Sequence, residues 1–172
     1  MRFKFNLKKL LPVLSVLLVV FFSLPSLAGG KEKLSLKTEG YLVKFVLLPN
    51  GNKKEELKPL PEKVYPGDVI EYRVIATNTS NGDLKDVVIR VRVPTGTSYV
   101  PGSASDSPEF SIDGGKSYSS EPVKYVVVEN GKKVIKTATP DMYTNLRWKV
   151  EFLKPGEERV FKYRVQVKPL NE

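Results

Sequence analysis

Apolar and polar residues alternate strictly in the middle of the chain. In residues 69–77 the apolar side of the alternation consists of Ile70, Tyr72, Val74 and Ala76. In residues 87–93 it consists of Ile89, Val91 and Val93, with arginines on the other side. A period of two is typical of strands with one buried and one solvated face. Because Asn81-Gly82 lies between the two stretches and Asn-Gly favours tight reversals, the pattern predicts an antiparallel hairpin.

Three further stretches carry the same alternation. Residues 34–48 place one apolar set on a single face: Tyr41, Val43, Phe45 and Leu47. In residues 146–152 the expected inward set is Leu146, Trp148, Val150 and Phe152. In residues 159–167 it is Phe161, Tyr163, Val165 and Val167. Trp148 is therefore expected to lie in the core rather than against a ligand, and Gly40 is expected to mark a kink or a bulge.

Turn signals separate the alternating stretches. Asp113-Gly114-Gly115 and Asn130-Gly131 predict two short hairpins, of which the second joins residues 123–128 to residues 134–137. The charged segment 53–63 contains two prolines and is expected to be a loop or an edge strand. No stretch beyond residue 28 keeps a helical period over several turns. The pattern therefore predicts an all-β fold, an antiparallel β-sandwich.

The chain of 172 residues has the length of one domain. Two turns of the same type, Pro66-Gly67-Asp68 and Pro155-Gly156-Glu157, each precede a strand and are expected to form equivalent corners of one sandwich. We expect residues 29–63 to form an N-terminal strand and a charged loop. Residues 64–172 are expected to form the sandwich, with an insertion at about 103–140.

Several short motifs occur in a fixed order along the chain. They are Pro66-Gly67-Asp68, Tyr72, residues 77–79, Pro94, residues 97–103, Trp148 and residues 153–157. In this order they resemble the domain of unknown function 11 family, the conserved repeat domain of bacterial and archaeal cell-surface proteins. The resemblance covers residues 64–168 and implies an immunoglobulin-like β-sandwich that is exported and non-enzymatic. The family often occurs as tandem repeats, whereas this chain holds one copy with the insertion at about 103–140.

The first 28 residues have the features of a secretory signal peptide. Residues 1–9 are basic, residues 10–24 are apolar, and Ser26-Leu27-Ala28 supplies small residues for a signal peptidase that would cleave between Ala28 and Gly29. The alternative is an uncleaved membrane anchor, which the short apolar core and its prolines argue against. We expect export to the periplasm, the cell surface or the medium, with no stable membrane insertion after cleavage.

Composition removes several function classes. The chain contains no cysteine and no histidine, so disulfides, thiol chemistry and histidine-based catalysis are excluded. Its formal charge is +9, and cleavage after Ala28 would leave 24 basic against 19 acidic residues. This mild excess, in an exported protein, does not indicate nucleic acid as a partner. No cofactor is expected. Calcium is the only metal to consider, and turn roles are favoured for its candidate ligands Asp83, Asp86, Asp106 and Asp113.

No catalytic constellation is apparent, and we expect a non-enzymatic protein. Residues 111–118 are similar to the Asp-box of sialidases, a motif in which the aspartate side chain closes a tight turn. Glycoside hydrolysis needs two carboxylates at a defined separation, but Glu55-Glu56 and Glu157-Glu158 are adjacent in charged turns and are expected to be solvated.

The charged sides of the strands suggest one candidate binding face. If the central, Trp148 and final strands shared a sheet, its outer face would carry Arg90, Arg92, Arg147, Lys149, Lys162 and Arg164. Two interpretations stay open: a basic platform for an anionic polymer, or a solvated face that discourages edge-to-edge aggregation.

Two functional hypotheses follow. The first is a structural or interaction domain of the cell envelope or surface that assembles with itself or with other surface proteins, for example by donating strand 34–48 to a neighbour. The alternative is a binding module for an anionic envelope glycan or a surface protein, through the basic face or the insertion at about 103–140.

Overall fold

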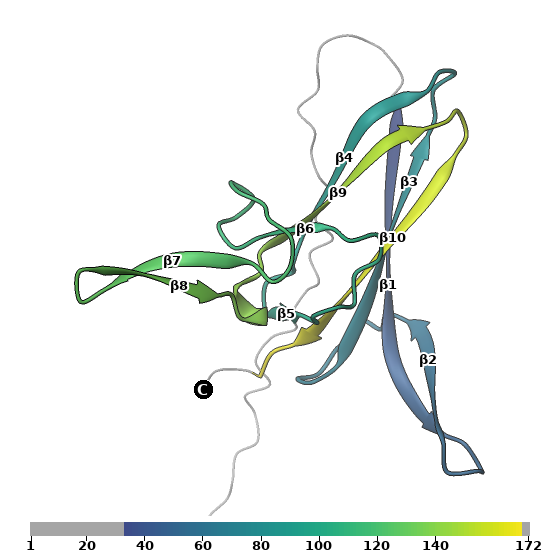
Figure 1. Ribbon diagram of the computed structural model, residues 1–172. Coiled ribbons are helices and arrows are strands. Elements are labelled where there is room, and N and C mark those ends of the chain that lie inside the picture. Colours follow the sequence, from purple (N-terminus) through teal and green to yellow (C-terminus); the bar gives the residue numbers. More distant parts are fainter. Residues whose placement is uncertain (1–32, 170–172) are drawn as a thin grey trace, which may run out of the picture.

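Two antiparallel sheets pack against each other, and a separate hairpin projects from one side (Figure 1). The computed structural model describes residues 33–169. Its strands are β1 (Leu34–Leu47), β2 (Lys53–Pro59), β3 (Val69–Asn78), β4 (Leu84–Arg92), β5 (Thr97–Tyr99), β6 (Glu109–Ser111), β7 (Lys124–Glu129), β8 (Lys132–Thr137), β9 (Asn145–Leu153) and β10 (Glu158–Val167). A 3-10 turn, η1 (Pro140–Met142), is the one helical element of this part. Within residues 33–169 no helix has the length and apolar character needed to cross a membrane.

The two packed sheets differ in width. The larger has five strands in the order β2-β1-β3-β10-β5, and the smaller has three in the order β4-β9-β6. Among the described strands, β7 and β8 pair only with each other. All pairings are antiparallel. The prediction of an all-β fold with antiparallel sheets in a sandwich arrangement is confirmed.

The core between the sheets is rich in aromatic rings. Tyr72 and Tyr163 stack with ring centroids 5.4 Å apart, and Trp148 lies 5.2 Å from the ring of Phe161. Trp148 is 1% exposed, and its Nε1 donates to the carbonyl oxygen of Ser105 at 2.8 Å, so its polar atom is satisfied inside the core. The expected inward sets of β3 and β10 are all buried: Ile70, Tyr72, Val74, Ala76, Phe161, Tyr163, Val165 and Val167.

The predicted hairpin between residues 69–77 and 87–93 is wrong. β3 pairs with β1 and β10, whereas β4 pairs with β9 in the opposite sheet. The buried amide of Asn78 holds this crossover, since its Nδ2 donates to the carbonyl oxygens of Gly82 at 2.8 Å and Leu153 at 2.7 Å. The Asn81-Gly82 turn does reverse the chain, but β3 and β4 both have to bury their apolar faces, and these faces point toward each other. The two strands therefore face each other across the core and do not pair.

The two Pro-Gly-acid turns have the same geometry, which confirms that they are equivalent. In the first, the N–H of Tyr65 donates to Asp68 Oδ2 at 2.8 Å, and the N–H of Asp68 donates back to the Tyr65 oxygen at 2.9 Å. In the second, the N–H of Lys154 donates to Glu157 Oε2 at 2.8 Å, and the N–H of Glu157 donates to the Lys154 oxygen at 2.9 Å. In each turn the acidic side chain closes the loop that proline and glycine begin.

These turns fasten the two ends of the β3–β10 pair. The N–H of Gly67 donates to the oxygen of Val167, and the N–H of Gly156 donates to the oxygen of Asn78, both at 2.9 Å. The glycines have φ of 88° and 72°, a region that favours residues without a Cβ. The turn sequence therefore sets both limits of the central strand pair.

Residues 34–48 belong to the chain's own sheet. β1 pairs with β3 at ten positions, from Leu34 opposite Asn78 to Val43 opposite Val69. On its other side β1 pairs with β2, which makes the charged segment an edge strand. β1 is therefore an interior strand of the sheet in this chain, and donating it to a neighbour would require its pairings with β2 and β3 to open.

Gly40 does not mark a bulge, because the β1–β3 register continues through it. A Cβ at Gly40 would lie 2.9 Å from Leu60 Cδ2 and 3.4 Å from the ring of Tyr72. Gly40 therefore makes room for Leu60 to cover the core beside β1.

The alternation in β9 breaks near its end. Phe152 is 51% exposed, whereas Leu153 is fully buried, so the expected inward position of Phe152 is wrong. On the paired strand β4, Asp86 has φ of 52°, which twists the backbone at the same level. Lys85 lies over the exposed ring of Phe152, with Nζ 5.7 Å from the centroid. At this end of β9 the inward position is therefore Leu153, one residue later than a strict period of two predicts.

Candidate interaction surfaces

The six basic residues do not share one face, so the predicted basic platform is wrong. Arg90 and Arg92 lie on β4 and Arg147 and Lys149 on β9, both in the three-stranded sheet, whereas Lys162 and Arg164 lie on β10 in the five-stranded sheet. The central strands belong to different layers, and their outward faces point away from each other. The candidate residues therefore form two separate groups.

Arg164 is engaged by two carboxylates. Its Nη1 and Nη2 donate to Glu55 at 2.8 and 2.6 Å, and its Nε and Nη2 donate to Glu71 Oε2 at 3.0 and 2.8 Å. Arg73 Nε adds a contact of 3.0 Å to the other oxygen of Glu71, whose side chain is only 6% exposed. Hydrogen bonds from Arg164 lower the pKa of Glu55, and the same bonds raise the pKa of Arg164. This arginine holds β10, β3 and β2 together.

A second cluster neutralises the basic residues of β9. Arg147 Nε and Lys149 Nζ contact the two carboxylate oxygens of Glu109 at 2.5 and 2.9 Å. The hydrogen bonds from Lys149 and Arg147, that from Lys149 having the larger effect, lower the pKa of Glu109. The guanidinium of Arg147 also lies 4.3 Å from the ring centroid of Tyr118. Among residues 33–169, Arg90, Arg92 and Lys162 are the members of the predicted set that have no ion pair.

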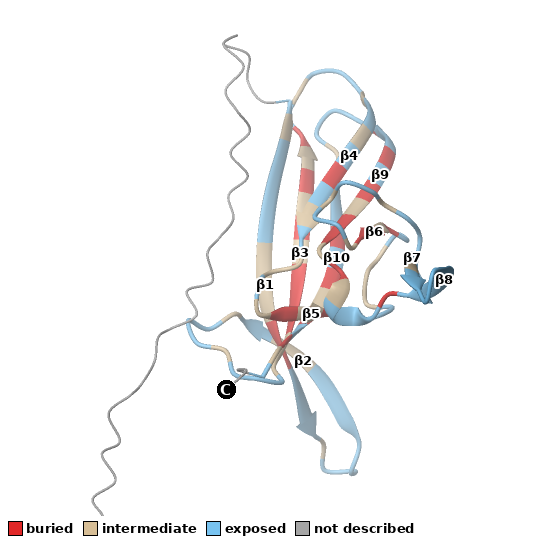
Figure 2. Ribbon diagram, turned by 90° about the vertical axis from the view of Figure 1, so that its left-hand side faces the viewer, coloured by how far each residue is buried: buried red, intermediate tan, exposed pale blue. Residues whose placement is uncertain are grey.

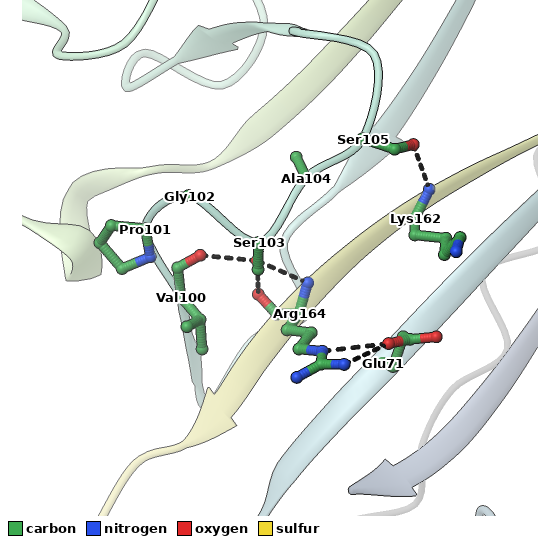
Figure 3. A pocket seen from close by; sticks show the side chains of 9 residues that line it. All are labelled: Glu71, Val100, Pro101, Gly102, Ser103, Ala104, Ser105, Lys162 and Arg164. Carbon is green, nitrogen blue, oxygen red and sulfur yellow. Dashed lines mark hydrogen bonds and ion pairs between the residues drawn. The ribbon is translucent and has the colours of Figure 1, made fainter. Parts of the chain in front are cut away.

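An open hollow of about 400 Å³ lies beside β10 (Figure 3). Its walls are Glu71, residues 100–105, Lys162 and Arg164. The hydroxyls in it hold the chain to β10, since Ser103 Oγ accepts from the N–H of Arg164 at 2.9 Å and Ser105 Oγ accepts from the N–H of Lys162 at 3.0 Å. With Glu71 and Arg164 paired to each other, Lys162 is the charged group that the hollow leaves for solvent.

The β7–β8 hairpin, residues 124–137, projects from the sandwich (Figure 1). One of its faces is apolar and solvent-exposed: Val126 is 58%, Val128 is 69% and Ile135 is 70% exposed. Val126 and Ile135 are directly opposite in the register. The base of the hairpin is fixed, because the flanking Val123 and Ala138 are buried and the N–H of Ala138 donates to the Val123 oxygen at 2.8 Å. The hairpin is thus an anchored arm with an uncovered apolar face.

The far end of the β1–β2 hairpin is a second exposed apolar site. Phe45 is 64% and Leu47 68% exposed, although they continue the alternation that buries Val43. This end extends past the last β1–β3 pair, which involves Val43, and projects at the lower end of the molecule in Figure 1. Lys44 Nζ contacts Asp68 at 2.9 Å and ties the hairpin to the first Pro-Gly-acid turn.

The Asp-box-like segment forms a closed turn. Asp113 Oδ1 accepts from Ser111 Oγ at 2.6 Å and from the N–H of Lys116 at 3.0 Å, while Oδ2 accepts from Ser117 Oγ at 2.5 Å. Hydrogen bonds to the carboxylate hold the pKa of Asp113 far below its usual range. The hydroxyl of Ser111 has the largest effect, and the hydroxyl of Ser117 and the nearby N–H groups follow. The carboxylate is fully used in shaping this turn, as the sequence predicted.

The remaining carboxylates do not converge on one point. Glu55 belongs to the Arg164 cluster and Glu157 closes a turn and contacts Arg159 at 2.9 Å, so neither pair of adjacent glutamates acts as a unit. In the part of the chain that the structure describes, no three aspartate or glutamate side chains are grouped as a cation site requires.

Comparison with known proteins adds no relative. No family model matches the chain, no curated protein is similar to it, and no solved structure matches its fold. The resemblance to the conserved repeat domain therefore stays a prediction. The predicted signal peptide, with its cleavage site at Ala28 and Gly29, lies outside the described residues.

The sequence did contain a signal for the exposed arm. Val126, Val127 and Val128 follow one another without the polar residues that would mark a solvated side. Such a run in a short hairpin indicates two apolar faces, and a two-stranded hairpin can turn only one of them onto the sandwich. The sequence analysis predicted a short hairpin over these residues but did not predict which of its faces would be exposed.

Proposed function

We propose that the protein is an exported, non-enzymatic interaction domain of the cell envelope or cell surface, with an immunoglobulin-like β-sandwich as its scaffold. One observation carries this proposal: the anchored β7–β8 arm exposes Val126, Val128 and Ile135 on one face. Soluble domains rarely leave such residues together in water unless a partner covers them. The arm is the contact surface, and the partner is a surface protein or another copy of the chain.

The anchoring of the arm supports this function. A two-stranded hairpin is marginally stable alone, but here its base is buried through Val123 and Ala138. Tyr125 packs against the core from the same strand that exposes Val126 and Val128. A preorganised apolar face loses little conformational entropy on binding, which favours association.

Glycan binding is the weaker candidate. It rested on a single basic face, whereas the six residues lie on two sheets and three of them are bound to carboxylates: Arg147, Lys149 and Arg164. Their charge is largely neutralised at short range, so a polyanion would gain less from them.

The test compares the full-length protein with the double variant Val126→Ser and Ile135→Ser in the cells that produce it. Covalent cross-linking followed by separation of the envelope fraction should give a cross-linked species for the unaltered protein and lose it for the variant. Phe152→Ser is the matched control, because Phe152 is 51% exposed but lies on the body of the sandwich. Recovery of the unaltered protein as an uncross-linked monomer, or loss of the product in the control as well, would overturn the proposal.

A further inference from the structure

Within residues 33–169, the smaller sheet ends at β4, which has no strand on its outer side. In the sheet order β4-β9-β6, β4 pairs with β9 alone among the described strands. Ring contacts fix how the sheets overlie each other: Trp148 of β9 meets Phe161 of β10, and Phe110 of β6 meets Tyr99 of β5 with centroids 4.9 Å apart. The next strands, β4 and β3, then face each other. No strand of the smaller sheet lies opposite β1, as Figure 2 shows.

The core-facing side of β1 is correspondingly uncovered. Leu36 is paired with Ala76, so both side chains lie on the same face of the sheet. Ala76 is fully buried, whereas Leu36 is 50% exposed. Thr38 is likewise exposed although its partner Val74 is buried. An additional strand beside β4 would cover this part of β1.

The outward side chains of β4 define what such a strand should carry. Arg90 lies directly opposite Arg147, a like-charged pair that is unfavourable in a sheet. Arg147 is neutralised by Glu109 from β6, on its other side. Arg90 has an arginine on one side and the open edge on the other, and Arg92 likewise has no ion pair within residues 33–169. A carboxylate on an added strand would give these arginines the ion pairs that they lack.

We infer that residues 87–92 of β4 are a docking edge for an extended segment of a partner protein that alternates apolar and acidic residues. The apolar side chains cover Leu36 and the rim of the core, and the acidic ones pair with Arg90 and Arg92. Backbone hydrogen bonds to the β4 edge supply affinity, as in other cases of strand addition. This inference rests on the proposed function, since it names a second contact of the same interaction domain and the chemistry of its partner.

The charges of the edge also select against the wrong partners. Arginines on an edge strand and the positive φ of Asp86 at its start are devices that discourage unspecific pairing. Two copies pairing through β4 would bring arginine against arginine. Of the other edge strands described, β2 carries three lysines and two glutamates, β7 and β8 together carry four lysines and one glutamate, and β5 and β6 are only three residues long. A second copy is therefore a poor occupant, and an acidic strand is a good one.

The test uses the full-length protein and a synthetic peptide of alternating valine and glutamate, as long as residues 87–92. A peptide with lysine in place of glutamate is the control. Fluorescence anisotropy should show about tenfold tighter binding of the acidic peptide, from two charge pairs, and a loss of that preference at about 0.5 M salt. Hydrogen exchange should slow at residues 87–92 when the acidic peptide is bound.

Two charge variants make the result specific. Arg90→Glu should remove the preference between the peptides, because the new carboxylate offsets Arg92, while Lys162→Glu, the same change on an exposed residue of the other sheet, should leave it unchanged. Equal binding of both peptides, or protection at a site other than β4, would overturn the inference. If hydrogen exchange at β4 slows as the protein concentration rises, without any peptide, the edge binds a second copy. That result would also overturn the inference. The Val126→Ser, Ile135→Ser variant should bind the acidic peptide normally, so a failure of the arm and a failure of the edge are distinguished.

Discussion

Replacing Arg164 with methionine removes the residue that joins three strands of the larger sheet. Methionine keeps most of the length of the side chain and loses every hydrogen bond to Glu55 and Glu71. The Glu71 side chain is 6% exposed, so its carboxylate would remain buried with Arg73 as its one cationic partner. A buried charge that loses a partner destabilises the folded state, because water cannot replace the missing bonds.

The expected cost is about 2 kcal/mol in the free energy of unfolding. Breaking a fully buried pair costs about 3–5 kcal/mol, but Arg164 is 26% exposed and Arg73 still reaches Glu71, which reduces the effect. The exposed pair with Glu55 adds less than about 1 kcal/mol. For a domain of this size, 2 kcal/mol corresponds to a fall of about 7 °C in the unfolding temperature.

Thermal unfolding followed by circular dichroism measures this change. Arg90→Met is the matched control, since Arg90 is an exposed strand arginine without an ion pair and should change the free energy by less than about 0.5 kcal/mol. In the Arg164→Met background, Glu71→Gln should cost less than it does alone, because the two residues are coupled. Equal unfolding temperatures for Arg164→Met and Arg90→Met would refute the reasoning.

Three further predictions concern packing, backbone and pH. Gly40→Val should cost about 2 kcal/mol in thermal unfolding, because its Cβ would meet Leu60 at 2.9 Å, and shortening Leu60 to alanine in the same chain should recover part of that loss. Gly156→Ala should cost about 1 kcal/mol in urea unfolding, because φ of 72° disfavours a Cβ that has nothing else to clash with; Gly82→Ala, which has an open site and no positive φ, should be nearly neutral. Glu109 and Asp113 have folded pKa values below their ordinary ones, so their stabilisation is complete at neutral pH and is lost as the pH falls below about 4. Asp113→Asn should flatten that acid dependence in unfolding temperatures measured between neutral and acidic pH, and an unchanged acid profile would contradict the role assigned to the turn.

Local pattern was enough to predict the inward faces of the central strands β3 and β10. The inward positions of β3 and β10 follow from alternation alone, because a period of two decides which side chains share a face whatever the neighbouring strand is. The two Pro-Gly-acid turns could also be predicted from the sequence, since proline, glycine and an acidic side chain favour one loop geometry through hydrogen bonds within four residues. The turn closed by Asp113 could be predicted for the same reason, because its hydrogen bonds are also local.

Which strands pair with each other, and which sheet each strand joins, could not be predicted in this way. The sequence of β3 and β4 is compatible with a hairpin, and only burial of both apolar faces in one core places them in opposite sheets. That choice separated Arg90 from Arg164, which the alternation had put on one face. It also left Leu36 without cover although its position in the alternation is like that of buried residues.

The sequence by itself determined that this chain is a β-protein, which residues point inward in its central strands, and where its tightest turns lie, because these depend on neighbours along the chain. The tertiary structure decided which arginines are paired, which hairpin projects and which sheet edge is open. Those properties depend on contacts between residues far apart in sequence, such as Arg164 with Glu55 or β9 with β4, and a local pattern carries no information on which distant strand will lie alongside.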